Sequence, residues 1–360
     1  MGSKLSEEMI MEIILRSSLK TLDAMRCTSN DLDKLTYDSY FLDHYKKINN
    51  IVLGCLLQNT IRGCINIQEF VASRDSNTLN LKFLPDNAKV LACSEQGIMV
   101  FQSPNPRFHM KDLYHICKPA TQQVLPLPNP KTKYITEKVA IVVRSMNPLH
   151  YKIVRLSEPK CRVLTTKDKM EYSTRRFEIF DSNEWVWKPL PDLVMLPFGV
   201  SITDPQPITT RGSIYMLLTN SDILRVDAYS ATWKILTPPA PTLECDQDGT
   251  SKQLVKYSGK LGFAFKPPNG CWEIWVLNID QSWEKVYVFN VNQDIGNKRI
   301  KAGLYDADTR AMADSGTIVS YMFKEGEIDS SQIFSFRSDF EPADLCGRQK
   351  LMAGLEILSF

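Results

Sequence analysis

The spacing of apolar residues changes near residue 50, from a helical period to a strand period. Before that point Met9, Ile10, Ile13 and Ile14 recur at intervals of three and four. This spacing predicts an amphipathic helix with one apolar stripe. Ser6 precedes two glutamates, so it is predicted to cap that helix, with acids in the first turn that favour the helix dipole.

Two shorter helices are predicted to follow. Ser17 and Ser18 interrupt the apolar stripe, and a second series at intervals of three is formed by Leu19, Leu22 and Met25. Ser29 is predicted to cap a third helix that carries Leu32 and Leu35. About 40 residues bury too little surface to cover all of these side chains. We therefore expect apolar area to remain uncovered, with Leu5, Met11 and Leu15 partly off the main stripe.

Beyond residue 49 the pattern is that of short strands separated by Pro, Gly, Asn and Asp turns. The boundary is placed near residues 46–50. The sequence predicts an α+β multidomain chain: a short helical domain over residues 1–48 and an all-β domain over residues 49–360.

A weak internal repeat runs through the β part. Each copy is a strand, a turn, an aromatic or apolar residue and an exit that usually contains proline; the copies cover residues 114–128, 177–191, 223–239 and 273–286. In the third copy Asp227 is predicted to start the turn, and Trp233 to wedge between neighbouring sheets. Repeats of roughly 45 residues are typical of propeller blades, and they predict about six to eight blades. Residues 212–218 and 259–265, each opening with glycine, are predicted as inner strands.

Composition and charge argue against several classes of protein. There are 43 basic and 41 acidic residues, a formal net charge of +2, which gives no footprint for nucleic acid or an anionic membrane. Nine scattered cysteines and four histidines show no metal spacing. No apolar run approaches the ~20 residues of a membrane helix. We expect no cofactor, and a cytoplasmic or nuclear protein with reduced thiols. Residues 1–6 match the loose N-myristoylation pattern, but Leu5 and Ser6 already open the first helix.

Candidate chemistry is sparse. No Gly-x-Ser-x-Gly elbow or phosphate-binding glycine loop is present. Asp181, Asp306 and Asp308 are interpreted as turn-forming acids, with a metal or acid–base role as the alternative. Cys93 and Cys117 lie in apolar strands and are interpreted as buried packing residues. The tryptophans are interpreted as packing between sheets, with an aromatic cage as the alternative; they are Trp185, Trp187, Trp233, Trp272, Trp275 and Trp283.

The N-terminal residues resemble an F-box. The matching positions are Leu5, Glu7, Glu8, Ile13, Ile14, Leu19, Lys20, Leu22, Arg26, Cys27 and Phe41. Four departures stand out: Ser6 and Ser18 replace prolines, Met25 replaces a phenylalanine, and Asn30-Asp31-Leu32 replaces Lys-x-Trp. The lost tryptophan removes a broad aromatic contact.

The β part resembles the F-box-associated, kelch-like β-propeller of plant F-box proteins. The resemblance is carried by residues 92–100, 116–121, 151–155, 254–262 and 273–277, in that order. The Gly-Gly doublet of true kelch repeats is absent.

Together the two resemblances imply a non-catalytic substrate receptor of an SCF-type cullin ubiquitin ligase. The helices would bind a Skp-family adaptor and, through it, cullin, while the propeller would bind an unknown target protein. The adaptor-facing or supporting set is expected to be Leu5, Met9, Ile13, Leu19, Leu22, Met25 and Leu32. Two alternatives stay open: a propeller binding module outside any ligase because the F-box is degenerate, and an enzyme on a propeller scaffold.

Overall fold

The computed structural model describes the residues that carry the helices and most of the strands. They are 6–26, 28–36, 41, 44–45, 48–49, 51–61, 65–72, 77–104, 112–146, 148–159, 164–167, 170–203, 206–240, 252–257, 259–265, 272–289, 330–340 and 343–346. Within these ranges, no helix has both the length and the apolar character needed to cross a bilayer. The predicted turn acids Asp306 and Asp308 lie outside them.

Three short helices come first, as the apolar spacing predicts. They are α1 (Glu7–Leu15), α2 (Leu19–Arg26) and α3 (Asn30–Thr36). Both predicted caps are confirmed: the Ser6 hydroxyl accepts from the Met9 N–H at 3.3 Å, and the Ser29 hydroxyl accepts from the Asp31 N–H at 3.3 Å. Each cap satisfies a backbone donor that the helix start leaves unpaired.

The helices share a small core of their own. Its buried members are Ile14, Leu15, Leu22, Phe41, Tyr45 and Ile51. Phe41 and Tyr45 stack with ring centroids 5.6 Å apart. The Tyr45 hydroxyl donates to the Ser17 carbonyl at 2.8 Å, and the Asn49 amide donates to the Leu15 carbonyl at 2.7 Å. These bonds tie the chain that leaves the helices to the end of α1, so the helical unit is fixed at its junction with the first strand.

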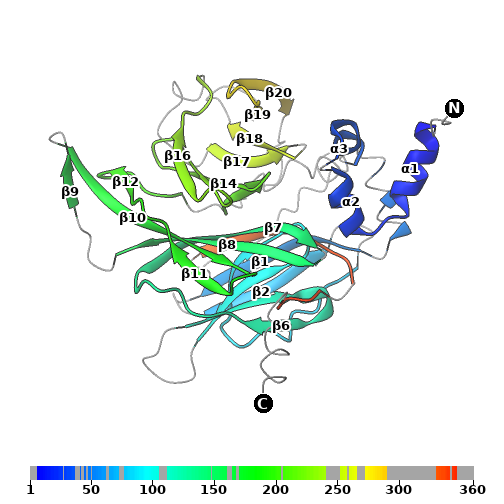
Figure 1. Cartoon of the computed structure of the whole chain (residues 1–360), viewed down its shortest axis with the longest axis horizontal. Coiled ribbons are helices and arrows are strands. Elements are labelled where there is room, and N and C mark those ends of the chain that lie inside the picture. Colours follow the sequence, from blue (N-terminus) through cyan, green and yellow to red (C-terminus); the bar gives the residue numbers. More distant parts are fainter. Residues whose placement is uncertain are drawn as a thin grey trace, which may run out of the picture.

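The strands form five sheets in the described part of the chain (Figure 1). Sheet 1 contains β1 (Val52–Ile61), β2 (Ile65–Ala72) and β21 (Ser330–Ser338). Sheet 2 contains β3 (Lys89–Cys93), β4 (Met99–Ser103), β5 (Leu113–Lys118) and β6 (Gln123–Pro126), and a short 3-10 helix, η1 (Pro119–Thr121), joins the last two. Sheet 3 contains β7 (Ile135–Met146), β8 (Leu149–Glu158), β10 (Met170–Asp181) and β11 (Val186–Pro189), and β9 (Leu164–Lys167) and β12 (Val194–Pro197) pair with the first half of β10.

The last two sheets are antiparallel four-stranded meanders. Sheet 4 contains β13 (Ile208–Thr210), β14 (Ser213–Leu217), β15 (Ile223–Asp227) and β16 (Thr232–Leu236). Sheet 5 contains β17 (Lys252–Tyr257), β18 (Lys260–Phe265), β19 (Trp272–Leu277) and β20 (Trp283–Phe289). Consecutive sheets are therefore built from consecutive stretches of chain, apart from the late strand β21.

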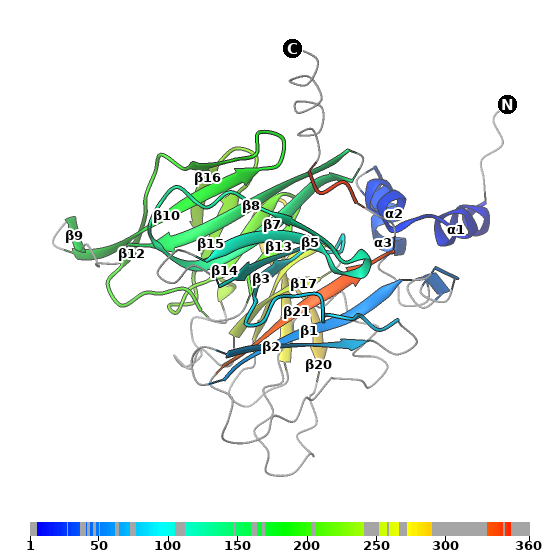
Figure 2. The same cartoon turned by 90° about the horizontal axis from the view of Figure 1, so that it is seen from below.

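Neighbouring sheets meet face to face, in the manner of propeller blades. Separate apolar clusters lie between sheets 1 and 2, 2 and 3, 3 and 4, and 4 and 5. One edge strand of each sheet lies against that of the next sheet: β21 of sheet 1 against β3, then β3 against β7, β7 against β13 and β13 against β17. Sheet 1 joins the two ends of the β part, since β1 pairs antiparallel with β21 along its whole length (Figure 2).

The described residues thus form a five-sheet propeller arrangement, not the six to eight blades predicted from the sequence. The prediction divided the chain by about 45 residues per blade. Sheet 3 breaks that rule, because it extends from β7 to β12 and uses residues 135–197 for one blade.

The predicted repeat is confirmed as the outer hairpin of four sheets. Its copies coincide with β5–β6, β10–β11, β15–β16 and β19–β20. Each hairpin turn has one residue in the left-handed region, directly before the outer strand at Gln122 (φ 54°), Trp185 (φ 55°) and Ala231 (φ 53°), and two residues before it at Gln281 (φ 68°). The predicted role of Asp227 also holds, since its carboxylate accepts from the Tyr229 and Ser230 N–H groups, each at 2.9 Å.

Trp187 and Trp283 pack between sheets as predicted, and the indole N–H of each donates to a backbone carbonyl. Trp187 Nε1 donates to the Pro128 carbonyl at 2.7 Å, and Trp283 Nε1 donates to the Thr237 carbonyl at 3.0 Å. In both cases the acceptor lies just after the outermost strand of the preceding sheet. Trp233 is partly buried against the core between sheets 3 and 4. The side chain of Trp272 lies outside the described set.

The prediction for the two strands that open with glycine is wrong in one respect. Residues 212–218 and 259–265 contain β14 and β18, which are the second strands of their sheets and not the innermost ones. For β14 the preceding strand gave no pattern, because β13 is only three residues long. Glycine is nevertheless required at the first of these turns: Gly212 has φ +78°, and a Cβ there would lie 2.2 Å from the Tyr229 ring.

Candidate protein-binding surface on the N-terminal helices

Helix α1 divides into a covered side and an open side. Ile14 and Leu15 are buried, and Ile10 and Met11 pack against the same core. Met9 and Ile13 are 54% and 52% exposed. They are four residues apart, so their side chains lie next to each other on one face, one helical turn apart. We call Met9 and Ile13 the α1 apolar pair.

This division corrects the predicted stripe. The sequence placed Met9, Ile10, Ile13 and Ile14 on one face and left Met11 and Leu15 partly off it. In the structure Leu15 is 6% exposed and Met11 lies against the core, whereas Met9 and Ile13 face solvent. The reason is that apolar residues cover a wide arc of α1, and contact with Leu22, Phe41 and Tyr45 decides which part is buried.

The other predicted adaptor residues have different positions. Leu22 is fully buried, so it can only support the helical core. Met25 and Leu32 are partly buried against that core. Leu5 and the side chain of Leu19 lie outside the described set. The structure therefore brings two residues of the predicted set to the surface, Met9 and Ile13.

One residue near this unit was not predicted. Ile48, the last helical residue described before β1, is 50% exposed. Its single apolar side chain among lysines and asparagines gave no periodic signal in the sequence. An exposed isoleucine beside the helical core adds to the apolar surface that the chain itself leaves uncovered.

Polar residues frame the α1 apolar pair. Glu12 and Arg16 form an ion pair at 2.6 Å on the exposed side of the helix, with side chains 55% and 72% exposed. Such exposed pairs contribute little to stability, about 0–1 kcal/mol. Together with the apolar pair they give the mixture found at protein interfaces, an apolar centre with a polar rim.

The potentially reactive side chains outside the helices lie in surroundings typical of residues with a structural role. Across the described ranges, no three His, Cys, Asp or Glu side chains are grouped as metal ligands would be. Burial raises the pKa of the Cys117 thiol well above its ordinary value, with a further contribution from Cys93. A thiol with a raised pKa is a poor nucleophile at neutral pH.

Asp181 has the geometry of a turn residue. Its carboxylate accepts from the Asn183 N–H at 2.9 Å and lies 3.1 Å from the His150 ring. Burial acts to raise the pKa of Asp181, but the Asn183 N–H and the His150 ring outweigh burial, and the pKa is lowered. An ionised acid that holds its own turn agrees with the structural interpretation made from the sequence.

Comparison with known proteins gives one informative relative. No family model matches the chain. The chain is 31% identical over 175 residues to "F-box protein At5g41720" of Arabidopsis thaliana, an alignment that covers 45% of this chain and 91% of that protein.

Solved structures are only remotely similar. TolB from Acinetobacter baumannii aligns with a TM-score of 0.37 and 9% identity, over 67% of this chain and 54% of that one. The GH43 protein BlXynB from Bacillus licheniformis aligns with a TM-score of 0.32 and 9% identity, over 58% and 43%. The chain thus spans about half the length of these structures or less. The relative from Arabidopsis is covered almost completely at 31% identity, and on that ground the chain belongs to the F-box protein family.

Proposed function

We propose that this protein is the substrate-recognition subunit of an SCF-type cullin ubiquitin ligase. The helical unit, residues 1–48, binds a Skp-family adaptor and through it cullin. The propeller, residues 49–360, is of the F-box-associated, kelch-like class and binds a target protein. The complex acts in the cytoplasm or the nucleus.

The observation that carries the proposal is the α1 apolar pair. Fully burying one such side chain contributes about 1.5–3 kcal/mol. Met9 and Ile13 still expose about half of their surface, so an adaptor that covers both would gain roughly 1 kcal/mol or more from each. The pair sits on a capped helix whose opposite side is held by the helical core, and a fixed surface loses little entropy on binding.

The reaction needs no catalytic side chain in this chain. A receptor that holds a target beside a ubiquitin-charged enzyme raises the effective concentration of the reacting groups. Its contribution is geometry: the short connection between the helical core and β1 fixes one binding surface relative to the other. Tyr45 and Asn49 make the bonds that stiffen this connection.

One departure supports the rival function, a propeller module outside a ligase. Where the family pattern has a tryptophan, Leu32 is partly buried in the helical core. A leucine there offers an adaptor less area than an indole ring, which buries 150–250 Å² in general. The rival predicts a folded chain that shows no adaptor binding at micromolar concentration.

The test is a titration of the full chain with a purified Skp-family adaptor. Met9→Ala and Ile13→Ala should each weaken binding about five- to 150-fold, because interface anchors typically contribute 1–3 kcal/mol. The matched control is Ile279→Ala: Ile279 is 89% exposed and lies in the turn between β19 and β20.

All three substitutions remove exposed apolar side chains, so stability should change by no more than about 0.5 kcal/mol. Circular dichroism should show the same folded content for each. The proposal is wrong if wild type and both α1 variants bind the adaptor equally, or if none of the folded chains binds it.

A further inference from the structure

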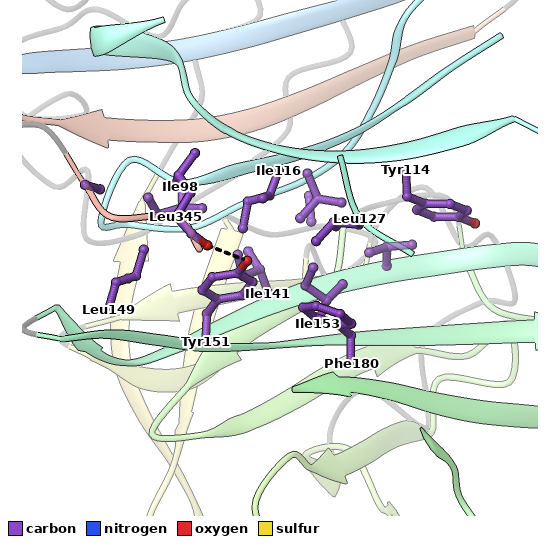
Figure 3. Close-up of a cluster of buried hydrophobic side chains, with 14 of the residues drawn as sticks. Ile98, Tyr114, Ile116, Leu127, Ile141, Leu149, Tyr151, Ile153, Phe180 and Leu345 are labelled. Atoms are coloured by element: carbon purple, nitrogen blue, oxygen red, sulfur yellow. Dashed lines mark hydrogen bonds between the residues drawn. The ribbon is translucent and has the colours of Figure 1, made fainter. Parts of the chain in front are cut away.

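A short segment after the last strand lies across two sheets and is held mainly by side chains. We call residues 343–346 the strap. Ala343 and Leu345 are 8% and 6% exposed and belong to the apolar cluster between sheets 2 and 3. Figure 3 shows Leu345 in that cluster with Ile98 and Tyr151. Asp344, between the two anchors, faces solvent.

The body of the protein recognises the strap's backbone. The Gln123 side chain donates to the Ala343 carbonyl at 3.0 Å and accepts from the Ala343 N–H at 2.9 Å. A single amide thus bonds to both backbone groups of Ala343. The Ala343 carbonyl also accepts from the Leu345 N–H at 3.1 Å, so the strap forms a tight turn. The Tyr151 hydroxyl donates to the Leu345 carbonyl at 3.1 Å (Figure 3). Hydrogen bonds to backbone groups do not depend on the identity of the side chain, so they can form with any peptide of similar shape.

The groups that hold the strap belong to well-packed strands. Gln123 begins β6, and Tyr151 lies in β8 and is fully buried. Tyr151 also stacks on Phe180, with ring centroids 6.2 Å apart. Because these side chains are fixed by sheets 2 and 3, the site does not depend on the strap for its shape.

The segment before the strap is anchored separately. Asp339 follows β21 directly and pairs with Lys118, which is 1% exposed, at the end of β5. The Arg337 side chain donates to the Glu95 carbonyl at 3.1 Å. These contacts hold the end of β21 in place whether or not residues 343–346 are seated. The strap can therefore leave without opening sheet 1.

We propose that the strap site, formed by Gln123, Tyr151 and the apolar cluster beneath them, is a peptide-recognition site that the strap occupies in the resting chain. Its ligand is a peptide that makes the same tight turn, with a small residue and a leucine separated by one residue. Given the function proposed above, that ligand is a segment of the target protein. The tethered strap competes at an effective concentration on the order of millimolar, so a target must displace it.

The first test is the binding of a labelled peptide with the sequence of residues 341–349, with serine in place of the cysteine. It is measured on the full chain by fluorescence anisotropy. Leu345→Asp expels the strap, since a buried carboxylate is costly, and it should bind the peptide at least tenfold more tightly than wild type. Adding Gln123→Ala should remove that gain. The matched control Asp344→Asn changes an exposed strap residue and should bind like wild type.

The result that overturns the proposal is a folded Leu345→Asp chain that binds the peptide no better than wild type. A peptide with aspartate in place of leucine should not bind, and equal binding of both peptides also overturns it. Near-ultraviolet circular dichroism establishes that the variant is folded.

A second measurement uses the unaltered chain and does not depend on any variant folding. Cys346, half-buried at the end of the strap, should be alkylated several-fold faster when excess peptide displaces the strap, as read by mass spectrometry of that site. An unchanged rate at millimolar peptide would contradict the proposal. Neither measurement contains the adaptor, so a failure here leaves the adaptor titration standing, and the reverse also holds.

Discussion

The buried ion pair between Arg155 and Glu178 should be the most sensitive polar contact in the propeller. The two residues face each other across β8 and β10, and their side chains are 3% and 0% exposed. Arg155 also donates to Thr136 Oγ1 at 2.8 Å and to the Tyr134 carbonyl at 2.6 Å. Glu178 accepts from the Thr132 N–H at 3.0 Å. The pair thus holds residues 132–136, the connection from sheet 2 into sheet 3.

Glu178→Gln removes one charge and leaves the other buried. Removing one partner of a buried pair typically costs 3–5 kcal/mol, because the remaining charge is desolvated without compensation. The glutamine can still accept from Thr132, so we expect the lower part of that range, about 3 kcal/mol. The double variant Arg155→Met, Glu178→Leu removes both charges but leaves the Thr132 N–H and the Tyr134 carbonyl without these partners, at about 1–3 kcal/mol for each group. Because neither charge is then left buried alone, the double variant should lose less free energy than the sum of the losses measured for Arg155→Met alone and Glu178→Leu alone.

Urea unfolding followed by tryptophan fluorescence measures the unfolding free energy of each variant. The comparison holds if the slope of that free energy with urea concentration is the same for all of them. A matched surface control is Glu184→Gln, which removes an exposed acid paired with Lys188, and it should change stability by no more than about 1 kcal/mol. The reasoning fails if Glu178→Gln costs no more than this control. It also fails if the double variant loses as much as, or more than, the sum of its two single variants.

Three further predictions concern the propeller. Trp187→Phe removes the bond to the Pro128 carbonyl and part of the buried volume, so unfolding free energy should fall by about 1–3 kcal/mol in the same urea assay; an unchanged value would mean that the indole does not bridge the sheets. Gly212→Ala should cost more than about 1 kcal/mol, since the residue has positive φ and its Cβ meets the Tyr229 ring, and adding Tyr229→Ala should recover the part due to the clash. Burial acts to raise the pKa of Asp227, but the Ser230 and Tyr229 N–H groups outweigh it and the pKa is lowered. The contribution of the ionised Asp227 carboxylate to stability is therefore present above the unfolded pKa of about 3.9 and lost as pH falls through the folded pKa. The difference in unfolding free energy between wild type and Asp227→Asn should accordingly shrink below about pH 4 and stay constant from pH 5 to 7.

Local features of the fold could be predicted because their causes are local. Ser6 and Ser29 cap helices within three residues of themselves. Asp227 makes its turn with its own neighbours. The four outer hairpins were visible because strand, turn and aromatic follow one another along the chain.

Features that join distant parts of the chain left no such pattern. The pairing of β1 with β21 links residues 52–60 to residues 330–338. The bond between Gln123 and Ala343 spans 220 positions. A glutamine at the start of a strand has the same local sequence whether or not a distant backbone reaches it, so the strap site could not be predicted.

The candidate surface was predicted in part. Periodicity showed that α1 has more apolar residues than one face can hold. It could not show which of them Leu22, Phe41 and Tyr45 would cover. For that reason Met9 and Ile13 were named together with Leu22, although the first two are half exposed and the third is buried.

The most direct test of the central claim is hydrogen–deuterium exchange of the full chain with and without a Skp-family adaptor. The account predicts a complex in which protection rises in residues 7–15, around Met9 and Ile13, while β14–β16 exchange as in the free protein. Exchange that is unchanged in α1 at saturating adaptor, or protection confined to the sheets, would contradict it.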